Sequence, residues 1–484
     1  MLYTSTRSHL AAGSAEVILQ GIAADGGLFV PQEFPHFFPD NLAALHYQQL
    51  AEQIFALYLT DMPADAVSAA VAEAYALQHF PSGPAHVVSL GDDKTVLLEL
   101  WHGPTAAFKD LALQALPRLL LLAKRQLGVA EKTVILVATS GDTGKAALEG
   151  FKDVPGVQII VFYPAGGVSR IQELQMRTTG GSNTHVVGVR GNFDDCQNGV
   201  KMIFAQDHST HFSSANSINW GRLLPQIVYY FYAYGQLEKQ GRVKHGLPID
   251  ICVPTGNFGN ILAAWYAAKM GLPVRSFLCA SNENNVLTDA INGGCYDRNR
   301  PFFQTPSPSM DILISSNFER FLYDVSGQDN EYTAAAFQEM RRSGSFTIPA
   351  SLRMVWLGRM LAGFATAEAA FAAIRHVFAT YGYLLDPHTA YGYAVAEQFR
   401  HELGDATPLL LASTASPFKF PQAVLSALGV ETAGVMETAL LGLLSEKSGW
   451  RIPVSLDGLD ELPLRHDLVV DAQQMAAVVQ SVLS

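Results

Sequence analysis

The sequence predicts an α/β fold with doubly wound, mostly parallel sheets, and two observations support it. Short β-branched, apolar runs alternate with helical segments along most of the chain, the order expected for parallel strands joined by crossover helices. Several runs are apolar throughout, as expected for strands covered on both faces. The predicted strands are residues 95–101, 133–140, 159–164, 184–191, 250–256, 274–281 and 407–413.

Helical patterns fill the segments between these strands. Pro117 lies inside the first helical segment, and we expect it to kink or split that helix, because proline lacks the N–H group that a helix interior needs. The predicted helices are residues 109–127, 143–151, 222–240, 259–270, 331–343, 367–380 and 388–402.

The same patterns divide the chain into consecutive regions. Residues 1–80 carry helical patterns around a loop rich in proline, glycine and phenylalanine, and predict an N-terminal helical unit. A smaller α/β domain is predicted over residues 81–220, and a larger one over residues 221–435. Weak periodicity at about 290–360 indicates an inserted lobe within the larger domain. Residues 436–484 are left as a C-terminal extension with one short strand and a terminal helix.

The charge balance and the cysteine content restrict the partners of the protein. The 32 Lys+Arg and 44 Asp+Glu give a net charge of −12, which opposes nucleic acid and anionic lipid surfaces. The apolar runs fall short of the roughly 20 residues that span a bilayer. Four cysteines without a CxxC pair, and a start without the pattern of a signal peptide, suit a reducing compartment. We therefore expect a cytoplasmic protein that binds neither nucleic acid, nor a membrane, nor a metal.

One lysine stands in an unusual context. In the stretch WHGPTAAFKDLALQ, Lys109 follows two alanines and a phenylalanine at the start of a predicted helix. A solvated surface lysine is the ordinary alternative. An amine at a helix N-terminus among small and aromatic neighbours would have its pKa lowered by the helix dipole and by desolvation. A lysine that forms a Schiff base requires this property.

Two strand-to-helix loops are predicted to bind anions. The stretches ATSGDTGKAAL (138–148) and CVPTGNFGN (252–260) present glycines, short polar side chains and first-turn amides where a strand ends. The first is not a nucleotide P-loop, because Thr139 and Ala146 replace residues that a P-loop needs. An ordinary glycine-rich turn stays open for this loop. Two anion loops and one lysine together suggest a phosphorylated cofactor beside a second, acidic ligand.

Two further stretches place polar side chains at predicted helix starts. In SSANSINWGRLLPQ, Asn216, Asn219 and Arg222 are either caps with a surface cation or ligands of an anion. In LLLASTASPFKFP, Thr414 and Ser416 follow a buried strand, and they either cap the next helix or face a ligand. Both alternatives stay open from the residues alone.

Taken together, the motifs resemble the threonine synthase family. They are HGPTAAFKD, SGDTG, PTGNFGN, NSINWGR, SPSMDILISSNFER and the opening YTSTR with GIAADGGLFVP, and they occur in the family's order from residue 3 to about residue 425. The resemblance implies the tryptophan-synthase-β-like fold (fold type II) and the cofactor pyridoxal 5'-phosphate. It further implies conversion of O-phospho-L-homoserine and water to L-threonine and phosphate. A related phospho-lyase, or a threonine or serine dehydratase that releases a 2-oxo acid, would share every cofactor residue and stays the alternative.

The resemblance also implies roles for single residues. Lys109 would carry the cofactor as a Schiff base, Phe108 would lie beside it, and Thr414 would meet the pyridine nitrogen. The cofactor phosphate would bind the amides of Gly256, Asn257, Phe258, Gly259 and Asn260. The substrate carboxylate and the cofactor's ring oxygen would meet the loop of Ser140, Gly141, Asp142, Thr143 and Gly144. The substrate phosphate would bind Asn216, Asn219 and Arg222, with Lys145 and Arg170 as further candidates.

The chain departs from the family pattern at two positions. Ser416 replaces the histidine of STAHP, which removes any role of that histidine, and Ser8 replaces the glycine of STRG. We expect a monomer, with a dimer as the alternative, because the regions 1–80 and 290–360 could cover the surfaces that relatives of this fold use to form dimers.

Overall fold

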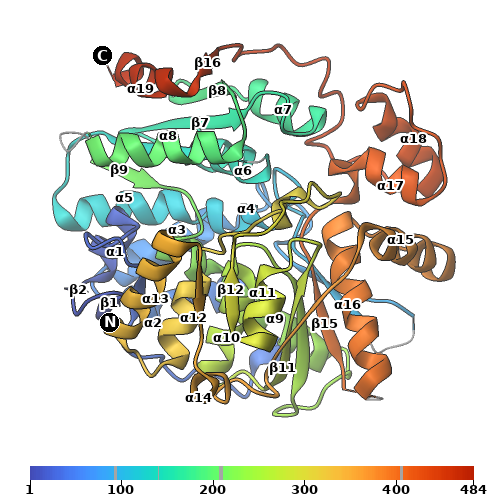
Figure 1. Ribbon diagram of the computed structural model, residues 1–484, viewed down its shortest axis with the longest axis horizontal. Helices are drawn as coiled ribbons and strands as arrows, with labels where there is room; N and C mark the ends of the chain where they lie inside the picture. The colour runs from blue at the N-terminus through green and yellow to red at the C-terminus, as the bar shows by residue number, and fades with distance from the viewer. Residues whose placement is uncertain (92–94, 140, 207–210, 404–406, 484) are drawn as a thin grey trace.

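The computed structural model describes residues 1–91, 95–139, 141–206, 211–403 and 407–483. Within these ranges two main sheets lie one above the other in the view of Figure 1, with helices between them and outside each. No helix of the described ranges is long and apolar enough to cross a membrane.

The larger sheet has six strands in its described part, in the order β14-β11-β10-β15-β5-β4. Only the edge strand β4 runs antiparallel to its neighbour, and the other pairs are parallel. The late strand β15 lies between β10 and the much earlier β5. In sheet order, the bounds are Met360–Phe364, Val274–Ser281, Ile249–Pro254, Leu409–Ser413, Thr95–Glu99 and His86–Ser89.

The smaller sheet has five strands in the described ranges, in the order β16-β8-β7-β6-β9, and all of its pairs are parallel. Its edge strand β16 comes from the last residues of the chain, so the C-terminal extension completes this sheet. In sheet order, the bounds are Val469–Asp471, Thr184–Arg190, Val157–Pro164, Thr133–Ala138 and His211–Ser214.

Successive residues of the strands alternate between two hydrophobic layers. In β6, Ile135 and Val137 face the central core, whereas Val134 and Leu136 face an outer core. Both sheets share the central core, because strands of the larger sheet also contribute to it. The sheets are therefore covered on both faces, which confirms the doubly wound α/β prediction. The helices of the central layer are α4 (Lys109–Leu113), α5 (Leu116–Leu127), α6 (Asp142–Phe151), α9 (Trp220–Lys239) and α10 (Gly259–Lys269).

Other helices close the outer faces of the sheets. Helices α8 and α19 contribute to the outer core of the smaller sheet, and α15 to α18 contribute to the outer core of the larger sheet. Helix α7 packs against α6. Their bounds are α7 Arg170–Arg177, α8 Phe193–Gln206, α15 Ala367–Tyr381, α16 Pro387–Leu403, α17 Pro421–Ala427, α18 Ala439–Ser448 and α19 Met475–Leu483.

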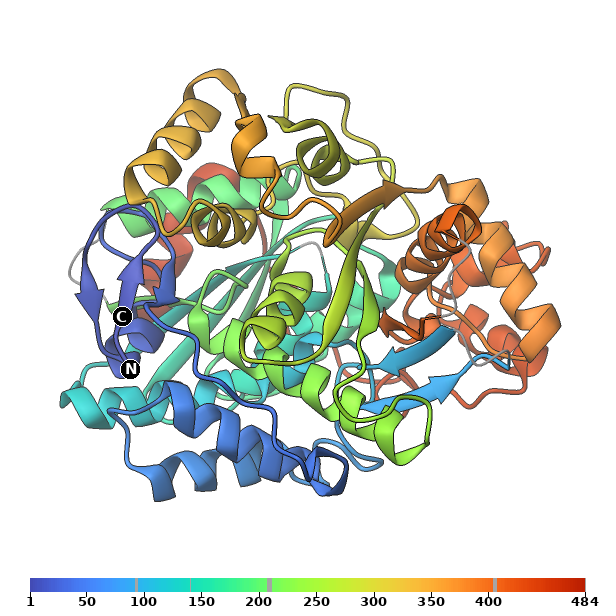
Figure 2. The same ribbon diagram turned by 90° about the horizontal axis from the view of Figure 1, so that it is seen from below.

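The N-terminal unit combines helices with a small antiparallel sheet of order β2-β1-β3. The structure brings this sheet beside the inserted lobe (Figure 2), where Arg7 forms an ion pair of 2.7 Å with Glu319. The elements are β1 Tyr3–Ser5, β2 Ala11–Ala12, α1 Ser14–Gln20, β3 Phe29–Pro31, α2 Tyr47–Tyr58 and α3 Ala64–Ala74.

The inserted lobe follows β11 and returns to the sheet at β14. It packs several aromatic side chains into the central core, and it carries the 3-10 turn η2 (Pro308–Met310) toward the carboxyl ends of the strands. Its other elements are α11 Val286–Gly293, β12 Cys295–Asp297, α12 Phe318–Val325, α13 Asn330–Ser343, β13 Ser345–Thr347 and α14 Ala350–Arg353.

All seven predicted strands are present, and the first predicted helix is split, with Pro117 in the first turn of α5. The strands divide between the sheets differently from the predicted regions. Strands β4 and β5 lie within residues 81–220 but belong to the larger sheet, while β16 of the extension joins the smaller one. A β-branched run indicates a strand but carries no information about its partner, which explains this difference.

Candidate functional site

The segment before α4 is held by the turn that follows β15. Ala107 forms a bridge with Ala415, and the Phe108 N–H donates a hydrogen bond of 2.8 Å to the Thr414 carbonyl. This pairing joins the strand-to-helix turn of the larger sheet to the start of α4. Lys109 is the first residue of α4, so its position is fixed by two segments that are far apart in sequence.

The Lys109 side chain lies against Asp142 and Ser309, and Lys419 lies on the other side of Asp142; we call this cluster the Lys109 pocket. Lys109 Nζ lies 3.6 Å from Asp142 Oδ2 and 3.5 Å from Ser309 Oγ, and 4.8 Å from the centre of the Phe108 ring. Only 10% of the Lys109 side chain is exposed. Burial lowers the pKa of Lys109, and the Lys419 and Arg222 cations lower it further, against the opposing effect of Asp142. This is the direction that the sequence context predicts.

Asp142 is the acidic centre of this pocket. Its Oδ1 accepts hydrogen bonds from Lys419 Nζ at 2.9 Å and from Gln172 Nε2 at 3.1 Å. Burial alone would raise the pKa of Asp142, but the Lys419 and then the Lys109 ammonium groups hold it well below its ordinary value. One ionised carboxylate therefore lies between two lysines. An uncompensated positive charge near Lys109 favours an anionic ligand.

The loop that precedes α6 is stabilised from within. Thr139 Oγ1 accepts hydrogen bonds from the N–H groups of Gly141, at 3.0 Å, and Gly144, at 2.9 Å. Those two amides are thus engaged by Thr139, and a ligand that used them would have to displace it. Thr143 is half-buried in the same turn, and Ser140 lies outside the described residues.

The second predicted anion loop leads from β10 into α10 against the inserted lobe. The Gly256 carbonyl accepts from Ser315 Oγ at 2.7 Å, and a Cβ on Gly256 would lie 2.6 Å from the Ser309 carbonyl oxygen. Phe258 has a φ of 61° and is buried. Asn257 accepts from the Asn317 amide at 3.1 Å through its carbonyl. The lobe therefore fixes the loop that opens α10.

Two buried donors near these loops lack a partner among the described residues. They are Asn260 Nδ2, in the first turn of α10, and Arg222 Nε, in α9. A buried donor without an acceptor costs roughly 1–3 kcal/mol, so each such atom in a native protein needs an explanation, for which water, an ion or a ligand are candidates. Burial lowers the pKa of Arg222 to about 10, which leaves it charged at neutral pH. Phosphate oxygens are suitable acceptors for each of these donors, and the N-terminus of α10 favours a phosphate beside Asn260.

Other predicted phosphate ligands are engaged by protein groups. Asn219 is fully buried and caps α9 through Gly221 N–H, while its Nδ2 donates to the Ile18 and Ser214 carbonyls. The cap, an alternative that the sequence left open, is therefore what the geometry supports. Lys145 pairs with Glu149 and Arg170 with Glu173. Asn216 is half-buried in the loop before α9.

Four residues that the sequence did not single out, Ser309, His388, Asp386 and Lys419, complete the site. Ser309 N–H donates to His388 Nε2 at 3.3 Å, and His388 Nδ1 lies 3.0 Å from Asp386 Oδ1. Lys419 is fully buried, and its Nζ also donates to the Thr105 carbonyl at 2.8 Å. The available signal for Lys419 was a lysine between phenylalanines in SPFKFP. Nothing local in the sequence marks His388.

Three family models together match nearly the whole chain. A model described as threonine synthase N terminus matches residues 2–75, one described as pyridoxal-phosphate dependent enzyme matches residues 89–414, and one described as threonine synthase, C-terminal matches residues 389–480. The middle match contains Lys109, Asp142, Ser309 and both predicted anion loops, and the third match contains Lys419.

Relatives and solved structures agree with these models. Threonine synthase of Pseudomonas aeruginosa is 39% identical over 451 residues, which cover 91% of this chain and 92% of that protein. Threonine synthase-like 1 of Pongo abelii is 40% identical over 89% of this chain, and the chain spans 60% of the length of that relative. A crystal structure of PLP-bound threonine synthase from Brucella melitensis is 36% identical, has a TM-score of 0.87, and is matched over 100% of this chain and 99% of that one. The chain therefore belongs to the threonine synthase family of pyridoxal-phosphate-dependent enzymes.

Proposed function

We propose that this protein converts O-phospho-L-homoserine and water to L-threonine and phosphate, with pyridoxal 5'-phosphate held by Lys109. The observation that carries the proposal is the pocket itself. A buried lysine of lowered pKa faces Asp142 and Ser309, and two buried donors, Asn260 Nδ2 and Arg222 Nε, have no partner among the described residues. Family membership selects this reaction among those that such a pocket could serve.

The cofactor fits the residues around Lys109. Its aldehyde carbon would be bonded to Lys109 Nζ, and its phosphate would meet the amides of Gly256, Asn257, Phe258, Gly259 and Asn260, with the unpartnered Asn260 Nδ2 as a further donor. Phe108 would pack beside the ring, and the Thr414 hydroxyl would face the ring nitrogen. Bound in this way, the cofactor supplies an electron sink that lets carbon-bound protons of the substrate leave.

The substrate presents two anionic ends to a protein of net charge −12. We place its phosphate on Arg222, because this buried guanidinium keeps an unpartnered Nε and bidentate pairing to phosphate suits its shape. Its carboxylate would meet the turn at Thr143, because the Gly144 N–H already donates to Thr139 Oγ1. Local cations and helix N-termini thus provide the attraction that the overall charge opposes.

Proton transfer is assigned to Lys109. Once the substrate amine has displaced it from the cofactor, its free Nζ accepts the Cα proton, and a pKa below that of an ordinary lysine makes the neutral amine accessible. The ionised Asp142, 3.6 Å away, then stabilises the protonated amine. Loss of one proton from Cβ accompanies breakage of the Cγ–O bond, which releases the γ-phosphate. A proton then adds at Cγ, hydroxide from water adds at Cβ, and the remaining proton of that water leaves with the phosphate.

Product analysis tests the reaction. Purified enzyme supplied with pyridoxal phosphate and O-phospho-L-homoserine should release threonine and phosphate in equal amounts. Lys109→Ala should abolish turnover and the cofactor that borohydride traps on the wild-type chain, while Lys132→Ala serves as a control at an exposed lysine before β6. Release of 2-oxobutyrate without threonine would identify a phospho-lyase, and turnover of threonine or serine to a 2-oxo acid would identify a dehydratase.

We also propose that the protein acts in the cytoplasm as a monomer. Four cysteines without a CxxC pair in a chain of 484 residues support a reducing compartment. The N-terminal unit and the lobe cover much of the central core, which supports a single chain as the functional unit. Light scattering at several concentrations should give a constant mass near that of one chain, and a mass that rises with concentration would refute the monomer.

A further inference from the structure

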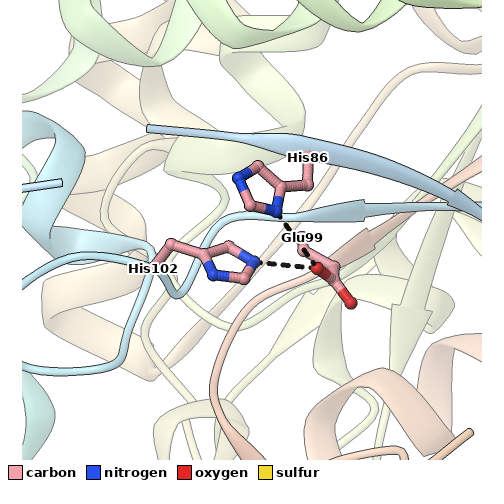
Figure 3. A group of neighbouring side chains, drawn as sticks. All are labelled: His86, Glu99 and His102. Carbon is pink, nitrogen blue, oxygen red and sulfur yellow. Dashed lines mark hydrogen bonds and ion pairs between the residues drawn. The ribbon is translucent and has the colours of Figure 1, made fainter. Parts of the chain in front are cut away.

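A cluster of two histidines and one glutamate lies at the edge of the larger sheet, apart from the pocket around Lys109. His86 of β4 and Glu99 of β5 are direct partners in the antiparallel pair, and His102 follows in the loop after β5. Figure 3 shows both imidazole rings directed at the same carboxylate oxygen. Glu99 Oε2 lies 2.8 Å from His102 Nε2 and 3.9 Å from His86 Nδ1. The three ligand atoms all lie within 4.8 Å of one another.

Each of the three side chains has a second polar atom that faces away from the cluster, and a neighbouring group contacts that atom. His86 Nε2 lies 2.6 Å from the Ser82 carbonyl oxygen, which selects the tautomer that leaves the Nδ1 lone pair directed inward. His102 Nδ1 lies 3.5 Å from Ser82 Oγ. The Tyr383 hydroxyl donates to Glu99 Oε1 at 2.6 Å, so that Oε2 is left for the cluster. Carbonyl, hydroxyl and phenol partners of this kind orient the ligands in metal sites of proteins.

We propose that His86, Glu99 and His102 bind a divalent transition-metal ion of the zinc type, with water as the remaining ligand. Two imidazole nitrogens and one carboxylate oxygen form a ligand set that zinc uses in open sites. Bond lengths of about 2.0–2.1 Å place neighbouring ligand atoms of a tetrahedral zinc about 3.3 Å apart. The distances of 2.8 and 3.9 Å bracket this value, and the third pair, His86 Nδ1 and His102 Nε2, lies within 4.8 Å. Side-chain adjustments on the order of 1–1.5 Å would bring all three pairs to it.

The exposure of the cluster suits such a site. The Glu99 side chain is 7% exposed, and those of His102 and His86 are 16% and 31% exposed. A buried carboxylate is thus covered by two ligands that solvent can still reach, which leaves an entry path for the ion and a position for water. The sequence did not indicate this site, because the spacing of the three residues matches no metal motif.

The bound ion would join two parts of the chain. His86 lies on the edge strand, whereas His102 lies in the loop that leads to Lys109 and stacks on Trp101 with ring centres 4.3 Å apart. A metal bridge would therefore fasten the edge strand β4 to the beginning of that loop. This inference does not rest on the proposed function, since none of the three residues belongs to the cofactor pocket.

Metal binding to the full-length holoenzyme tests the proposal. After removal of metals with a chelator, titration calorimetry with Zn²⁺ in a phosphate-free buffer should give about one zinc per chain. His86→Asn should weaken that binding at least about 100-fold, more than the loss of an orienting partner does. The matched control is His185→Asn, which replaces another half-buried strand histidine whose Nε2 contacts Gln158 at 3.2 Å. This control should bind zinc as the wild type does.

A second variant separates a built site from adventitious binding. Tyr383→Phe keeps all three ligands but removes the hydroxyl that orients Glu99, and it should weaken zinc binding about 10- to 100-fold. Co²⁺ in place of Zn²⁺ should give the visible absorption of a four-coordinate site in the wild type, and His86→Asn should lack it. Equal zinc affinity of wild type and His86→Asn, or no zinc binding by the wild type, would overturn the proposal. Zinc binding of equal strength in the wild type and every variant would be attributed to another exposed group, such as the thiol of Cys295.

Discussion

Replacing Lys419 with methionine should reveal the cost of leaving Asp142 without its main counter-charge. Lys419 Nζ lies 2.9 Å from Asp142 Oδ1, and the lysine is fully buried. At an effective dielectric constant of about 20, this separation corresponds to an attraction of about 6 kcal/mol, which desolvation of both charges offsets in part. Removal of one member of a buried pair generally costs about 3–5 kcal/mol. We therefore expect the free energy of unfolding of Lys419→Met at pH 7 to be about 3–5 kcal/mol lower than that of the wild type.

Urea denaturation of the cofactor-free protein measures this loss, followed by tryptophan fluorescence. Lys145→Met is the matched control, because its partner Glu149 is 29% exposed, and a pair near the surface contributes at most about 1 kcal/mol. The double variant Lys419→Met with Asp142→Asn should be more stable than Lys419→Met alone, since it no longer buries an uncompensated carboxylate. If Lys419→Met were as mild as Lys145→Met, or if Asp142→Asn gave no relief, the assigned charge arrangement would be refuted.

The pH dependence of the same variant gives an independent check. In the wild type the pKa of Asp142 is well below its ordinary value, so the stability from its ionised form is present above the unfolded pKa, near 4, and is lost only in stronger acid. In Lys419→Met, burial should raise the pKa of Asp142 above that of the unfolded chain. The folded variant would then bind the extra proton, and its deficit relative to the wild type should shrink as the pH falls from 7 toward 5.

Three further variants test other parts of the structure. Gly256→Ala places a Cβ 2.6 Å from the Ser309 carbonyl oxygen and should weaken pyridoxal phosphate binding at least about tenfold (about 1.4 kcal/mol) in a fluorescence titration; normal affinity would remove Gly256 from the cofactor loop. Asn219→Ala should lower the free energy of unfolding by about 1–3 kcal/mol through loss of the helix cap. The KM for the substrate should stay unchanged, and a raised KM would instead support the predicted contact of Asn219 with the substrate phosphate. The pKa of buried Asp110 is raised to about 6 by burial, so its contribution to stability is present below pH 4 and is lost as the pH rises to about 6. Asp110→Asn should remove about 3 kcal/mol of that pH-dependent change, and an unchanged stability–pH profile in urea titrations would contradict the raised pKa.

The sequence predicted the strands well because burial on both faces leaves a clear apolar signature. Strands β5, β6 and β10 were all expected within a few residues of their bounds. The short strands of the N-terminal unit and the lobe were missed, because two or three residues are too few to show a period. Strands β4, β9 and β14 of the main sheets, with four or five residues each, were missed as well. Sheet membership was also beyond reach, since pairing between distant segments is decided by packing of the whole chain.

In the candidate site, too, the sequence predicted the residues that a local pattern marks and missed those that act through distant contacts. Lys109 and the loop at 256–260 were accessible because a motif and a strand-to-helix turn mark each of them. Lys419 and His388 were not, because each acts through a contact with a residue far away in sequence: Lys419 with Asp142, and His388 with Ser309. A buried ion pair leaves no periodic trace, and only the folded backbone brings its members together.

The position of β15 between β10 and β5 has a consequence for biosynthesis. The middle of the larger sheet cannot be filled until Leu409–Ser413 has left the ribosome, and until then β5 and β10 each expose a row of unpaired backbone groups. Such long-range pairing folds slowly and leaves edges open to pairing with other chains. The same late segment also delivers Thr414 and Lys419 to the pocket of Lys109. The nascent chain must therefore protect two apolar edges over most of its synthesis, and a chain truncated before residue 409 would be prone to aggregate rather than form a smaller version of the fold.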